Sequence, residues 1–93
     1  MAAMINVKKT KEGEFRVVVR EGGGETSHVV SLDDHYYRKL TGGKVAAEEL
    51  VRKSFEFLLE RESKESILKQ FSLPVIGRYF PEYEREIREQ LGG

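Results

Sequence analysis

The sequence predicts an α+β fold in which a three-stranded antiparallel meander is followed by a helical C-terminal half. Between residues 4 and 32, apolar residues alternate with polar ones, which is the period of half-buried strands. From residue 34 onward the apolar spacing becomes that of helices. A chain of 93 residues with 39% hydrophobic residues has enough apolar material for one core. We therefore expect residues 1–93 to form a single domain.

The three strands are expected within residues 4–32. The alternation runs through residues 5–8 and again through 15–20, and the short loop 11–13 between them ends in a glycine that can adopt a positive φ. A third strand, residues 26–32, follows a glycine-rich loop. Together these segments predict a meander whose central strand is the second one.

A short helix is expected over residues 34–40. Side-chain oxygens in residues 31–34 can cap its first turn, and acidic groups there favour the positive end of the helix dipole. Gly42 and Gly43 should end it, because the residue just past a helix often takes the left-handed conformation that glycine adopts at little cost.

The longest helical pattern covers residues 46–62. Its apolar side chains span an arc of about 200° on a helical wheel, wider than the ~100° stripe of a helix that lies on one surface. We therefore expect two neighbours for this helix, the sheet on one side and the C-terminal region on the other. The residues of the arc are Ala47, Leu50, Val51, Ser54, Phe55, Phe57, Leu58 and Leu59.

Three short helices are expected in the rest of the chain, over residues 64–71, 74–80 and 81–91. The first would bury three apolar side chains: Ile67, Leu68 and Phe71. Proline begins each of the other two, where its fixed φ and missing N–H are tolerated. These helices should cover the outer side of the long helix.

Charge and cysteine content exclude several classes of function. Sixteen Lys and Arg residues balance sixteen Asp and Glu residues, so no overall field attracts nucleic acid or an anionic membrane. The absence of cysteine excludes disulfides, thiolate metal sites and cysteine nucleophiles. The chain shows no signal-peptide pattern and no apolar run of about 20 residues. We expect a cytoplasmic protein without a cofactor.

Two short motifs are similar to known signatures but depart from them. Residues 41–44 resemble the end of a phosphate-binding loop, yet Arg38 stands where its first glycine is required, and Val45 where a Ser or Thr would hold magnesium. Residues 71–76 resemble the turn of a helix-turn-helix, yet the next helix offers Arg78 as its sole basic side chain. We interpret the first motif as a helix stop and the second as buried structure.

His28 and His35, with Asp33 and Asp34, are the one group that suggests a metal site or an acid–base pair. Their spacing is not that of known metal ligands, and adjacent residues on a helix point in different directions. We therefore expect His35 on the surface and His28 near a strand end, and we assign no catalytic or metal-binding residue.

The segment 71–83 concentrates aromatic and branched apolar residues in a chain whose mean hydropathy is −0.51. Part of the segment should cover the long helix. Tyr79, Tyr83 and part of Val75 are expected to remain exposed, and together with Val18 on the outer sheet face they form our candidate protein interface.

A small basic patch is expected on the outer face of the sheet. Lys8, Arg16 and Arg20 should share this face, where they could contact phosphate or an acidic partner. The alternative is an ordinary solvated sheet face. Because Val18 should lie on the same face, a protein contact there is favoured over a phosphate contact.

The helical half carries a resemblance. The run EELVRKSFEFLLERE at residues 48–62, with KESIL at 64–68 and RYFPEY at 78–83, resembles short uncharacterised prokaryotic proteins. This resemblance implies a small prokaryotic protein and brings no known activity with it. A sheet followed by helices is also similar to the arrangement in HicB-like antitoxins, but the residues characteristic of that group are not matched, so this is an analogy of fold alone.

Three functional hypotheses follow. The first is a small non-enzymatic protein that acts through protein–protein contacts as a homodimer. The second is nucleic-acid binding or antitoxin-like regulation through the basic sheet face. The third is a small enzyme that uses His28 or His35, and it has the least support because acid–base catalysis needs groups that converge in a pocket.

Overall fold

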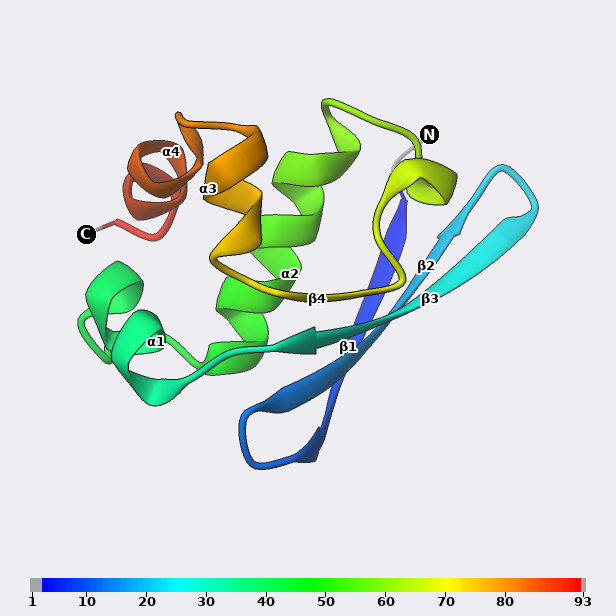
Figure 1. Ribbon diagram of the computed structural model, residues 1–93. Coiled ribbons are helices and arrows are strands. Elements are labelled where there is room, and N and C mark those ends of the chain that lie inside the picture. Colours follow the sequence, from blue (N-terminus) through cyan, green and yellow to red (C-terminus); the bar gives the residue numbers. More distant parts are fainter. Residues whose placement is uncertain (1–2, 93) are drawn as a thin grey trace.

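The computed structural model describes residues 3–92 (Figure 1). The first three strands form the predicted antiparallel meander, and a fourth short strand extends it into a sheet of order β1-β2-β3-β4. The φ of Gly13, 76°, lies in the left-handed region that the first turn requires. The α+β class and the meander are confirmed. The strands are β1 (Met4–Lys11), β2 (Glu14–Glu21), β3 (Gly24–Ser31) and β4 (Gln70–Ser72).

The strand register determines which side chains face the core. Val17 of β2 lies opposite Val7 of β1 and His28 of β3, and all three point to the same side. Phe15, Val17 and Val19 are buried on that side. The alternate residues of the three long strands point the other way and are exposed or half-buried, so that face is open to solvent.

Within residues 3–92 the remaining elements are four α-helices and one 3₁₀ turn, and the helices lie on one side of the sheet (Figure 1). The predicted signals at the first helix operate as expected: the Asp33 carboxylate accepts the Tyr36 N–H at 2.7 Å, and Gly42 ends the helix at a φ of 67°. The elements are α1 (Asp34–Thr41), α2 (Ala47–Leu59), η1 (Lys64–Ser66), α3 (Val75–Tyr79) and α4 (Tyr83–Gln90).

Helix α2 has the two neighbours that its wide apolar arc predicts. In Figure 1 it lies between the strands and the C-terminal helices. On the sheet side, the ring of Phe55 lies 5.3 Å from that of His28 and 6.0 Å from that of Phe71. On the other side, the ring of Phe57 lies 5.8 Å from Phe80 and 5.2 Å from Tyr83. Both faces of α2 therefore contribute to the core.

The prediction of a helix over residues 64–71 is wrong. The chain makes only the short turn η1 and then runs extended into β4, which pairs in parallel with β3. The Val29 N–H donates to the Lys69 carbonyl at 2.8 Å, and the Leu73 N–H donates to the Ser31 carbonyl at 2.9 Å. A helix would leave these groups of β3 unpaired at the sheet edge, and a helix this short has little stability of its own.

The extended path changes which side chains of this segment are buried. Ile67 is buried, Phe71 is half-buried, and Leu68 is 48% exposed. Leu68 was expected in the core, so that expectation is also wrong.

Candidate functional site

An apolar groove of about 400 Å³ lies between the C-terminal end of α2, the segment from η1 to β4, and helix α3. Ten residues line the groove, and their side chains are apolar except for Glu62, Ser66 and the hydroxyl of Tyr79. A hollow beside the Gly22–Gly24 turn is of similar size, but polar residues and glycines form most of its wall. An apolar concave surface with a few polar groups is typical of a binding site.

Two large apolar side chains stand exposed at this groove. Tyr79 is 67% exposed and Leu68 is 48% exposed, and both line the groove. The third exposed large hydrophobic side chain of the described residues, Met4, lies at the start of β1 and is not part of it. Apolar exposure is therefore concentrated at the groove.

The structure places the four predicted interface residues in three different locations. Val75 and Tyr79 line the groove. Val18 is half-buried on the outer sheet face, as its register with β1 and β3 requires. Tyr83 is fully buried, and its hydroxyl lies 2.6 Å from Ser54 Oγ, so the prediction that it is exposed is wrong.

Ser54 could have indicated the burial of Tyr83. It is a polar residue inside the apolar arc of α2, and buried hydroxyls almost always have a hydrogen-bond partner. Tyr83 stands in the apolar stripe of the last helix and can supply that partner.

One wall of the groove is held in place by His28. Its Nδ1 lies 2.8 Å from the Leu68 carbonyl, and its Nε2 lies 2.9 Å from Thr26 Oγ1. Because a carbonyl can only accept, Nδ1 carries the proton. Burial lowers the pKa of His28, which favours the neutral imidazole. His28 lies inside β3 rather than near a strand end, so the expected position is corrected.

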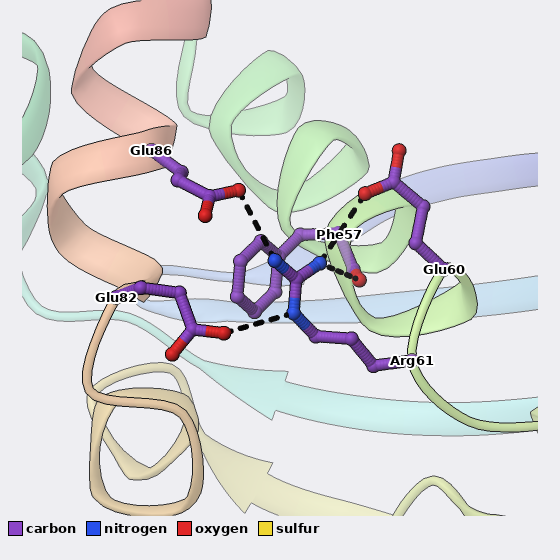
Figure 2. A network of polar contacts seen from close by, with 5 residues as sticks. All are labelled: Phe57, Glu60, Arg61, Glu82 and Glu86. Atoms are coloured by element: carbon purple, nitrogen blue, oxygen red, sulfur yellow. Dashed lines mark hydrogen bonds and ion pairs between the residues drawn. The ribbon is translucent and has the colours of Figure 1, made fainter.

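Arg61 joins the end of α2 to α4 (Figure 2). Its Nε and Nη2 lie 3.1 Å from the carboxylates of Glu82 and Glu86, and its Nη1 donates to the Phe57 carbonyl at 3.1 Å. Nη1 also lies 3.2 Å from Glu60, and the guanidinium is 3.6 Å from the centre of the Phe57 ring. With its donors engaged, Arg61 serves to hold α4 on α2.

The three predicted basic residues share the outer sheet face. Lys8 lies directly opposite Arg16, whose Nε donates to Ser27 Oγ at 3.2 Å. Among residues 3–92 neither Lys8 nor Arg16 has a carboxylate partner. Arg20 pairs with Glu25 at 2.7 Å, so its charge is largely balanced. The patch is therefore reduced to two unbalanced cations.

The described part of the chain, residues 3–92, contains no group of three or more His, Cys, Asp or Glu side chains that could hold a metal ion. His35 is exposed, as predicted, and both ring nitrogens of His28 are already engaged. None of the helices in this part is long and apolar enough to cross a membrane.

Comparison with protein-family models, with curated proteins and with solved structures gave no match. The resemblance to short uncharacterised prokaryotic proteins and the analogy with HicB-like antitoxins therefore stay predictions.

Proposed function

We propose that the protein acts through contact with another polypeptide, without catalysis, and that the groove is the contact surface. The supporting observation is that Tyr79 and Leu68, 67% and 48% exposed, stand beside walls that are themselves apolar. Each Å² of such surface removed from water contributes about 25 cal/mol, so a partner that covers the groove gains a hydrophobic driving force.

The groove also indicates the chemistry of the partner. Glu62 is the one charged residue in its lining, and among residues 3–92 it has no ion-pair partner. Covering a carboxylate with an apolar partner is costly unless a cation is placed beside it. The partner segment should therefore combine apolar or aromatic side chains with a Lys or Arg.

Site-specific photo-cross-linking tests this proposal. A benzophenone amino acid is placed at position 66, inside the groove, or at position 89, on the exposed side of α4. Each variant is irradiated in the cells that produce the protein, and the yields of cross-linked adducts are compared. We expect polypeptide adducts from position 66 that diminish when Tyr79→Asp is added, and few from position 89. Equal yields at the two positions, or no polypeptide adduct from position 66, would refute the proposal.

A second candidate function is favoured by the adjacent cations Lys8 and Arg16 on the uncovered sheet face. Binding of a labelled single-stranded RNA or a DNA duplex to this face should weaken on Lys8→Glu or Arg16→Glu and not on Lys44→Glu in an exposed loop. Two phosphate contacts give a slope of log affinity against log salt of about −1.8 for the DNA duplex and about −1.4 for the single-stranded RNA. Fluorescence anisotropy measures the loss of affinity on substitution and the salt dependence. If neither Lys8→Glu nor Arg16→Glu changes the affinity, this function is excluded.

A further inference from the structure

We infer that the polypeptide in the groove is a second copy of this chain, held in a two-fold contact in which Tyr79 of each copy enters the groove of the other and Arg78 meets Glu62. The inference rests on the proposed function and names its partner.

Helix α3 both lines the groove and projects from it. Val75 and Tyr79 are one turn apart, and the side chain of Tyr79 is 67% exposed. In a two-fold contact the same patch serves both copies, so a patch that carries a hollow and a projecting side chain complements itself. Here the groove is the hollow and Tyr79 is the projecting side chain.

The charges around the groove also complement each other. Glu62 lines the groove, and Arg78 is exposed next to Tyr79. Neither has an ion-pair partner within residues 3–92. A two-fold contact that joins the two would form the pair twice. The chain has 16 basic and 16 acidic residues, so no net charge opposes the approach of two copies.

The walls of the groove are fixed by contacts that lie behind them. His28 holds the Leu68 carbonyl at 2.8 Å, and Ile76 of α3 is buried in the core. Because these contacts hold Leu68 and helix α3 in place, the walls of the groove should not move together to cover Tyr79. A preformed surface of this kind favours a contact that needs little rearrangement.

Charge exchange between the copies tests the inference. In Glu62→Arg alone, and in Arg78→Glu alone, a two-fold dimer would contain two like-charge contacts. An equimolar mixture of the two variants would restore two opposite-charge contacts in the mixed dimer. By analytical ultracentrifugation we expect wild-type dimers, at least a tenfold weaker association of each single variant, and recovered association in the mixture. Tyr79→Asp should also weaken the dimer.

Matched controls are available on α4, where Glu89 and Arg85 are exposed and do not line the groove. Glu89→Arg and Arg85→Glu should associate like the wild type, and circular dichroism should show that every variant is folded. A wild-type chain that stays monomeric at about 1 mM, a mixture that does not reassociate, or controls as weak as the test variants would overturn the inference.

The two proposals can fail separately. If the chain is monomeric but position 66 cross-links specifically to a different polypeptide, the groove binds protein and the second copy is excluded as its occupant. If the purified chain yields an adduct of two copies from position 66, both proposals are supported. If no adduct forms in either setting, both are refuted.

Discussion

The buried hydroxyl pair of Tyr83 and Ser54 allows a direct test of how α4 is held on α2. Ser54 Oγ donates its proton to the Leu50 carbonyl at 2.7 Å, so at 2.6 Å the Tyr83 hydroxyl must donate to Ser54 Oγ. Both side chains are fully buried. Removing one partner therefore has a different consequence from removing both.

The magnitudes follow from this direction of donation. Ser54→Ala leaves the Tyr83 hydroxyl buried without a partner, which costs about 1–3 kcal/mol. Tyr83→Phe loses one hydrogen bond and leaves Ser54 still bonded to Leu50, which costs about 1 kcal/mol. The double variant leaves no unpaired hydroxyl, so it should be more stable than Ser54→Ala alone, by about 1 kcal/mol.

Urea unfolding followed by circular dichroism measures these free energies of unfolding. For a domain of this size, 1 kcal/mol corresponds to a shift in Tm of about 4–8 °C, so thermal unfolding is an independent check. Tyr79→Phe, which removes an exposed hydroxyl, should have little effect. If the double variant is less stable than Ser54→Ala, or if Tyr83→Phe is neutral, Tyr83 is not buried against Ser54.

Three further predictions follow from the contacts. Burial lowers the pKa of His28, so the folded protein favours its neutral form, and the free energy of unfolding should decline as the pH falls below about 6.5. In urea unfolding at several pH values, His28→Gln should remove this part of the decline and His35→Gln should not. Arg61→Lys keeps the positive charge, but a lysine cannot bridge two carboxylates or stack flat on an aromatic ring, so the free energy of unfolding should fall by about 1–2 kcal/mol. An unchanged free energy of unfolding would mean that the contacts of Arg61 with α4 do not stabilise the fold. At concentrations at which the chain is monomeric, Ile67→Ala should cost about 2–5 kcal/mol and Leu68→Ala about 1 kcal/mol, whereas similar losses would favour a helix over this segment.

The features that sequence predicted well depend on residues close together in the chain. Asp33 and Gly42 mark the two ends of α1, because caps act within one turn. The alternation of Phe15, Val17 and Val19 specifies a strand face by its period alone. The arc of α2 likewise required two neighbours, although it could not say which residues would supply them.

The features that sequence did not predict depend on distant partners. Strand β4 is three residues long and pairs with β3 some forty positions earlier, so it has no period of its own to reveal it. Tyr83 finds its partner Ser54 on another helix. In both cases the local sequence predicts one structure or exposure, and contact with a distant part of the chain produces a different one.

The error over residues 64–71 and the groove have the same physical cause. The extended path gains hydrogen bonds at Lys69, Ser72 and Leu73 and the bond from His28 to Leu68, each worth about 0.5–1.5 kcal/mol net. Its cost is that Leu68 stays 48% exposed, which forgoes about half of the 1.5–3 kcal/mol that full burial of a Leu would contribute. A helix over residues 64–71 would form backbone hydrogen bonds of its own but would leave the edge groups of β3 unpaired, so the extended path completes the sheet edge and leaves an apolar side chain partly exposed. A second copy that covers Leu68 and Tyr79 would bury this surface without disturbing β4, which is why the completed sheet edge and the proposed contact are compatible.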